Sequence, residues 1–314
     1  MRRYAAALAA GWLVLGGCGR VDLPPRLLQY EFQDQGPYRV VCAYNSEKRL
    51  VKKHAGRVFA ETHEGTHVET TYRVEAEREP GGGWVVAYTL LRLRLHDEDG
   101  RFKLEIGPEG GEVFWYQDTQ SLEDYLGPEI FQTYRRQVRL PLARVHVHAD
   151  GGQVPNGLEF NFSLLHTLGK NRVYGDFLAR GIKVPPVLMM VFKQASVRAG
   201  DTWDYAGNSG NAATHFSLTA LSTRSAQVAC VSDFSLGDEE LTTVRKALQL
   251  EAASGLVLKE SRMRVTGSVE FLLPAGRPEK GKMHFEKFYA MSLPAETWQL
   301  QETEDFKFSL TVSP

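Results

Sequence analysis

His63, Glu64 and His67 are the residues whose types and spacing could support catalysis. They belong to the run His63-Glu64-Gly65-Thr66-His67, which has the form His-Glu-x-x-His. On a helix, histidines four residues apart face the same way and can bind one zinc ion, while the glutamate activates a zinc-bound water. Chemistry of this kind would make the protein a zinc hydrolase.

The residues around this motif favour a strand over a helix. Gly65 lies inside the motif, and Val68, Thr70 and Thr71 follow it without the apolar spacing that a helix would bury. On an extended strand the two histidines would be about 13 Å apart, which is too far for one metal ion. We therefore expect an exposed polar strand or hairpin here, and the zinc hydrolase is the less favoured alternative.

A second pair of histidines could also contribute to a metal site. His146 and His148 would share one face of a strand, about 6.6 Å apart, and would need a third ligand from elsewhere. The alternative is a solvated strand face that ends at the Asp150-Gly151 turn. This second interpretation is favoured, so no metal site is predicted.

Other catalytic signatures are missing from the sequence. Ser209 lacks the glycine spacing of a nucleophile elbow, and there is neither a phosphate-binding loop nor a dinucleotide fingerprint. The carboxylates are scattered along the chain, and a formal net charge of −1 offers no basic surface for nucleic acid. We expect a protein that is not an enzyme, needs no cofactor and does not bind nucleic acid.

The N-terminal residues have the three parts of an export signal. Arg2 and Arg3 precede an uncharged run over residues 4–15, which is too short to span a bilayer, and Leu15-Gly16-Gly17-Cys18 follows. This arrangement resembles the lipobox signals of bacterial lipoproteins. The resemblance implies removal of residues 1–17, acylation of Cys18, and a tether over residues 18–28. A cleaved soluble form and an uncleaved anchor are the alternatives.

The same resemblance implies a location. Gly19, rather than aspartate, follows Cys18, which in a Gram-negative host favours the outer membrane, facing the periplasm. No second stretch has the roughly 20 apolar residues of a membrane span, so we expect the lipid to be the membrane attachment.

Two cysteines remain besides Cys18. Export would place Cys42 and Cys230 in a compartment that permits disulfides, and a bridge between them would tie an early strand to a late one. Both also lie among apolar residues, which is typical of buried free thiols. The sequence leaves both alternatives open.

Alternating apolar and polar residues predict antiparallel strands on both sides of a helical centre. Residues 68–75, 84–95, 102–106 and 138–149 read as strands before it, with hairpin turns at Asp99-Gly100 and Asp150-Gly151. Strand patterns resume at residue 202 and continue to residue 312. Helices are predicted over 121–136, with a kink near Pro128, and over 158–180 and 187–194.

The fold class that follows is mainly β (α+β). We divide the chain into an N-terminal β-rich half (29–157), a helical connector (158–194) and a C-terminal β-rich half (195–314). The strands at 71–75 and 84–88 are echoed at 214–218 and 226–230. This echo leaves open whether the two halves arose by duplication.

One motif carries a resemblance to a family. Gly200-Asp201-Thr202-Trp203 follows a Pro-Pro segment, with residues 265–271 as its downstream partner. Together they resemble a family of uncharacterised bacterial envelope lipoproteins with two β-rich halves. The resemblance implies architecture and export, and half-barrel-like proteins that carry lipids through the envelope are a more distant analogy at the level of the fold.

The apolar residues of the connector are candidates for the lining of a ligand cavity. They are Leu164, Leu165, Leu168, Phe177, Leu188, Met189 and Phe192. The alternative is that they bury the connector in the core. The sequence thus predicts a membrane-anchored protein that binds a hydrophobic ligand or an envelope partner, with a structural scaffold as the alternative.

Overall fold

One antiparallel sheet of 14 strands dominates the chain. The computed structural model describes residues 23–32, 36–169, 190–206, 213–234, 257–293 and 296–312. The first eight strands are β1 (Tyr38–His54), β2 (Arg57–Arg78), β3 (Trp84–Asp97), β4 (Phe102–Gly107), β5 (Gly110–Trp115), β6 (Asp118–Ser121), β7 (Ala143–Val147) and β8 (Gln153–Phe160). The others are β9 (Thr202–Ala206), β10 (Ala213–Leu221), β11 (Ser225–Phe234), β12 (Val257–Leu272), β13 (Arg277–Leu293) and β14 (Glu296–Val312). The mainly β class predicted from the sequence is confirmed.

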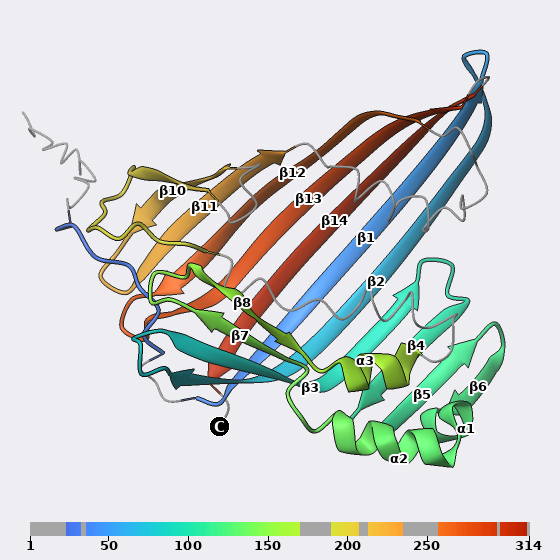
Figure 1. Cartoon of the computed structure of the whole chain (residues 1–314), viewed down its shortest axis with the longest axis horizontal. Helices are drawn as coiled ribbons and strands as arrows, with labels where there is room; N and C mark the ends of the chain where they lie inside the picture. The colour runs from blue at the N-terminus through green and yellow to red at the C-terminus, as the bar shows by residue number, and fades with distance from the viewer. Residues whose placement is uncertain are drawn as a thin grey trace, which may run out of the picture.

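The chain enters this sheet in the middle. Strand order is β6-β5-β4-β3-β2-β1-β14-β13-β12-β11-β10-β9, so each half of the chain forms a meander and the two meet where β1 pairs with β14. That pairing runs from Tyr38 opposite Val312 to His54 opposite Glu296. The two predicted halves therefore form one continuous open sheet (Figure 1). Within the described residues, β6 and β9 are the ends of the main strand order, and β8 ends the branch that leaves it at β3.

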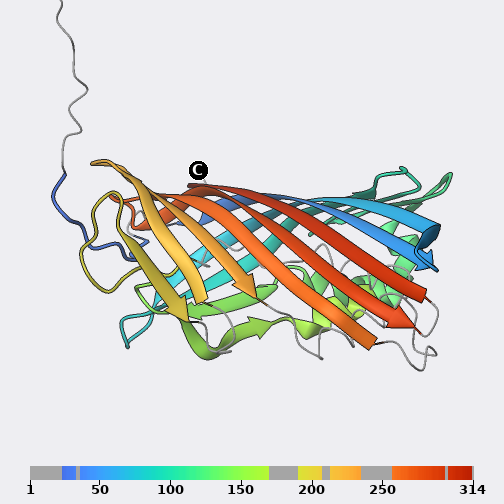
Figure 2. The same cartoon turned by 90° about the horizontal axis from the view of Figure 1, so that it is seen from above.

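The long strands bury one face. In β14 the side chains of Leu300, Phe306, Phe308 and Leu310 are buried, while the residues between them are largely exposed. This period of two gives the sheet an inner face and an outer face. At about 3.3 Å per residue, the 17 residues of β1 span about 55 Å, so the inner face is long as well as curved (Figure 2).

A small layer covers part of the inner face. It contains β7, β8 and the helices α1 (Leu122–Leu126), α2 (Pro128–Gln137) and α3 (Phe162–Gly169), all on the concave side of the sheet (Figure 2). Ser121 caps α1, and Gly127 (φ 77°) separates it from α2, which begins at Pro128. The helical segment predicted over 121–136 is confirmed, but the predicted kink near Pro128 is a complete separation into two helices. Tyr134 of α2 donates a hydrogen bond of 2.7 Å to the carbonyl of Gly107.

Two extended segments, residues 26–32 and 190–197, cross the end of the sheet where β1 begins. They pair with each other between Arg26 and Val197. Trp84 Nε1 donates to the carbonyl of Tyr30 (2.8 Å), and Trp203 Nε1 donates to the carbonyl of Val191 (2.7 Å). The segments and the sheet therefore share one core. The chain turns at Gly200 (φ 94°), and this turn places the Trp203 side chain in that core.

Three element predictions need correction. Leu158, Glu159 and Phe160 belong to β8, so the helical connector begins later than predicted. Residues 138–142 follow α2 without forming a strand, and β7 is correspondingly shorter than the predicted strand. Residues 190–194 are not helical, because their backbone groups bond to other segments; the Phe192 amide, for example, donates to the Asp150 carbonyl (2.7 Å). The remaining predictions for residues 170–189 and 241–250 lie outside the described residues.

Candidate functional site

The inner face carries a second apolar surface apart from the main core. Its members, which we call the far cluster, come from three adjacent strands, β1, β14 and β13, and are all 1–9% exposed. They are Leu50, Tyr289, Met291, Trp298 and Leu300. In the sheet, Leu50 lies opposite Leu300, which lies opposite Tyr289, and Trp298 lies opposite Met291. The cluster is therefore a continuous apolar patch two side-chain rows deep.

The far cluster lies toward the β1–β2 turn, beyond the small covering layer. β7, β8 and the helices lie across the lower end of the sheet, whereas β1, β13 and β14 continue to the upper right (Figure 1). Tyr44, on the same face of β1, belongs to the main core, and it precedes Leu50 by six residues, or about 20 Å of strand. The inner face thus extends well past the main core.

Charged side chains separate the two apolar surfaces. This charged band consists of Lys287, Glu302 and Glu304, all on the inner face. Lys287 Nζ lies 2.8 Å from Glu304 Oε1 and 3.6 Å from Glu302 Oε2, and Glu304 is 4% exposed. Burial acts to lower the pKa of Lys287, but the carboxylates of Glu302 and Glu304 outweigh it and raise that pKa above its ordinary value.

The side chain of Tyr44 contacts the charged band through Glu304. Burial raises the pKa of the Tyr44 hydroxyl, and the neighbouring Glu304 carboxylate raises it further and accepts its hydrogen bond. At the other side of the far cluster, Lys52 Nζ lies 4.2 Å from the centre of the Trp298 ring, a cation–π contact. Along its length the inner face therefore presents the main core, the charged band, the far cluster and Lys52 in that order. Because apolar and charged regions follow one another, this face suits an amphiphile better than a wholly apolar ligand.

The structure places the predicted cavity-lining residues differently. Leu164 of α3 and Phe192 are buried members of the main core, which agrees with the alternative interpretation of these residues. Phe192 contacts the rings of Tyr30 (5.3 Å) and Phe271 (4.9 Å). Leu165 and Leu168 lie in α3, but their side chains, and all of Phe177, Leu188 and Met189, are outside the described residues.

Cys42 and Cys230 are buried free thiols, so the disulfide alternative is wrong for this structure. Cys42 is on β1 and Cys230 on β11, and β14, β13 and β12 lie between them. A disulfide requires α-carbons less than about 7 Å apart, whereas neighbouring strands alone are about 4.8 Å apart. Burial raises the pKa of Cys42 to about 12 and that of Cys230 to about 11. Cys18 lies outside the described residues.

The His63–His67 motif is on strand β2, as the sequence analysis favoured, so the helix geometry of a zinc hydrolase is absent. His63 and His67 face outward and Glu64 faces the opposite side. His63 Nδ1 is 3.4 Å from Glu98, and His67 approaches Asn45 and His96 instead. The pKa of His67 is lowered mainly by its partial burial and, to a smaller extent, by the neighbouring His96.

His146 and His148 are not brought together with a third ligand. His146 Nδ1 pairs with Glu79 at 2.8 Å, and His148 follows the end of β7 and is exposed. Over the described part of the chain, no group of three or more histidine, cysteine, aspartate or glutamate side chains could hold a metal ion.

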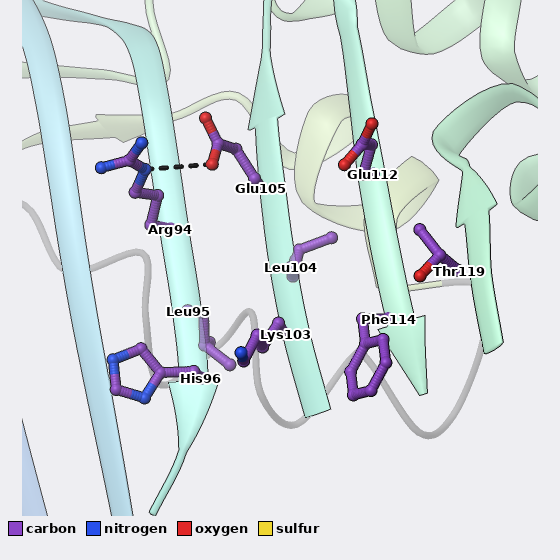
Figure 3. A pocket seen from close by; sticks show the side chains of 9 residues that line it. All are labelled: Arg94, Leu95, His96, Lys103, Leu104, Glu105, Glu112, Phe114 and Thr119. Carbon is purple, nitrogen blue, oxygen red and sulfur yellow. Dashed lines mark hydrogen bonds and ion pairs between the residues drawn. The ribbon is translucent and has the colours of Figure 1, made fainter. Parts of the chain in front are cut away.

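A pocket of about 290 Å³ lies on β3–β6 (Figure 3). It is lined by Arg94, Leu95, His96, Lys103, Leu104, Glu105, Glu112, Phe114 and Thr119. Two of its charged residues form an ion pair, in which Arg94 Nε lies 3.0 Å from Glu105. Hydrogen bonds from Arg92 and, to a smaller extent, from Arg94 lower the pKa of the Glu105 carboxyl. These pairs are exposed, and the arrangement is that of a solvated strand face.

Sequence reasoning missed the far cluster and the charged band, although a signal was present. In β14 every second residue from Trp298 to Leu310 points inward, and all are apolar except Glu302 and Glu304. Two acidic residues on the buried face of an otherwise apolar strand indicate a buried ion pair. Lys287 is on the same buried face of the neighbouring strand β13.

No family model and no curated protein matches the chain. Among solved structures it is similar to a lipovitellin described for its lipid–protein interactions, with 12% identity and a TM-score of 0.40; the alignment covers 90% of this chain, which spans only 26% of the lipovitellin chain. The chain is also similar to a LolA superfamily protein from Nitrosomonas europaea, with 10% identity, an alignment over 87% of each chain and a TM-score of 0.14. A third similar structure is an outer membrane channel from Pseudomonas putida, with 6% identity and a TM-score of 0.22; the alignment covers 93% of this chain and 98% of the channel. Because these TM-scores are low, the likenesses establish neither a common fold nor a common function.

Within the described residues, none of the helices has the length and apolar character needed to cross a membrane.

Proposed function

We propose that this protein binds an amphiphilic lipid on the inner face of its sheet. The acyl chain would lie along the far cluster, and the polar end would contact the charged band. The observation that carries this proposal is the position of the far cluster, a buried apolar cluster on the concave face that is not part of the main core. The proposed function is non-enzymatic.

The dimensions support this proposal. One leaflet contributes about half of the roughly 30 Å hydrocarbon thickness of a bilayer, so a single lipid chain fills about 15 Å. The stretch of β14 from Glu304 of the charged band to Trp298 of the far cluster is about 20 Å long, which is enough for such a chain together with its polar end. Lys287, Glu302 and Glu304 supply both donors and acceptors beside it.

Leu300→Glu tests the proposal directly. A carboxylate in the middle of the far cluster should weaken binding of a fluorescent fatty acid about tenfold or more, because an ionised group would have to be buried against the acyl chain. Binding is measured by fluorescence titration of the purified full-length chain. Native mass spectrometry of mildly purified wild type should also show noncovalent lipid, which solvent extraction separates from any lipid attached at Cys18.

Gln301→Glu is the matched control, since it introduces the same charge at the next residue, on the outer face. It should leave the titration unchanged. A folded wild type that carries no extractable lipid and does not bind the fatty acid would overturn the proposal, whatever the folding of the Leu300 variant.

A scaffold for another envelope protein is the second candidate. Its support is the open sheet, whose edge strands β6 and β9 leave backbone groups available for pairing with a partner strand. Co-purification of a stoichiometric protein partner from a lipid-free preparation would favour it over lipid binding.

We also propose that the chain is an envelope lipoprotein anchored through Cys18. The support is the Leu15–Cys18 sequence and the short apolar run before it. Mass analysis of the natural product should find an acylated Cys18 as its first residue. A product that retains residues 1–17 with an unmodified Cys18 would refute the anchor without affecting the proposal for the inner face.

A further inference from the structure

Two histidines lie side by side on the outer face of the sheet. His67 of β2 is directly opposite His96 of β3. Their ring centroids are 4.8 Å apart and the ring planes differ by 36°. The pair is separate from the far cluster and the charged band, because it projects from the opposite face of the sheet.

The hydrogen bonds of both rings leave the same nitrogen available. His67 Nδ1 is hydrogen-bonded to Asn45 Oδ1, and His96 Nδ1 lies 3.3 Å from the backbone carbonyl of Asp97. Both oxygens are acceptors only, so each Nδ1 carries the hydrogen, and each neutral ring keeps a lone pair on Nε2. An Nδ1–H donated to an oxygen is the usual support of a histidine that binds metal through Nε2.

The spacing of the rings also suits a shared ion. With metal–nitrogen bonds of about 2.0–2.1 Å and ring centres about 1 Å beyond the nitrogens, two imidazoles on one tetrahedral or square-planar metal have centroids about 4.5–5 Å apart. The observed 4.8 Å falls within this interval.

We propose that His67 and His96 bind a divalent transition metal ion of the Zn²⁺, Ni²⁺ and Cu²⁺ class through their Nε2 atoms, with water in the remaining positions. Glu69, on the same face of β2, is close enough to interact electrostatically with His67 and favours a cation there. Two imidazoles select these ions over Mg²⁺ and Ca²⁺, which prefer oxygen ligands.

Metal titration of the full chain tests this site. The protein is prepared without a histidine tag and with Cys18→Ser throughout, so that neither a tag nor the Cys18 thiol binds metal. Calorimetry with Ni²⁺ or Zn²⁺ should give one site, and His67→Gln and His96→Gln should each weaken it about tenfold or more. Asn45→Leu should weaken it about tenfold, because it removes only the hydrogen bond that orients His67.

His63→Gln is the control, since His63 is on the same strand and face but pairs with Glu98. It should leave the affinity unchanged, and the electron paramagnetic resonance spectrum of bound Cu²⁺ should show coupling to two imidazole nitrogens. Absence of stoichiometric binding by the folded wild type, or full binding by the His67→Gln/His96→Gln double variant, would overturn the assignment. Circular dichroism verifies that each variant is folded.

Discussion

Replacing Lys287 with methionine should lower the free energy of unfolding by about 3–5 kcal/mol, the usual cost of breaking a buried ion pair. The change leaves the Glu304 carboxylate, which is 4% exposed, without the ammonium that lies 2.8 Å away. Glu302 would then face Glu304 on the same strand without a shared cation. Urea denaturation followed by circular dichroism measures the loss.

Lys282→Met is the matched control, because Lys282 is an exposed residue on the outer face of the same strand. Its effect should be within about 0.5 kcal/mol. Adding Glu304→Leu to Lys287→Met should restore much of the stability, since it removes the buried carboxylate that has lost its ammonium. If Lys287→Met proved as harmless as Lys282→Met, the charged band would be solvated and could not hold a polar group away from water.

Phe271→Ala should cost about 3–5 kcal/mol, because it empties the space where the two crossing segments meet the sheet. Phe271 is 2% exposed, and its ring contacts those of Tyr30 (5.5 Å) and Phe192 (4.9 Å). Since Tyr30 and Phe192 belong to segments 26–32 and 190–197, limited proteolysis should show faster cleavage there. Thermal unfolding measures the loss of stability.

The control for Phe271→Ala is Phe59→Ala, which removes the same side chain where it is 55% exposed. It should change stability by no more than about 0.5 kcal/mol. Equal effects of the two substitutions would contradict a shared core between the crossing segments and the sheet.

Local patterns predicted much of the secondary structure. Hairpins at Asp99-Gly100 and Asp150-Gly151 formed where expected, because a glycine with positive φ follows an aspartate between apolar strands. The interruption near Pro128 was also predictable from local sequence, because proline fits the first turn of a helix and not its interior. The helix predicted over 187–194 failed in its described residues because cross-chain hydrogen bonds outweigh the weak local preference of Met190 and Val191.

The candidate site was less accessible to sequence reasoning. The apolar residues of the connector attracted attention by composition, whereas the structure buries Leu164 and Phe192 in the core. His67 was noticed for its spacing from His63, but its neighbour in space is His96, 29 positions later. A partner across a strand pair depends on register, which composition and periodicity do not specify.

By itself, the sequence determined the mainly β class, many of the antiparallel strands and the turns at Asp99-Gly100 and Asp150-Gly151, because these depend on residues close together in the chain. Only the tertiary structure decided that β1 pairs with β14 and joins both halves into one sheet. It also decided that Lys287 meets Glu304 and that the far cluster lies apart from the main core. Such contacts join residues distant in sequence, and their free energy comes from register and burial that arise only when the whole sheet assembles.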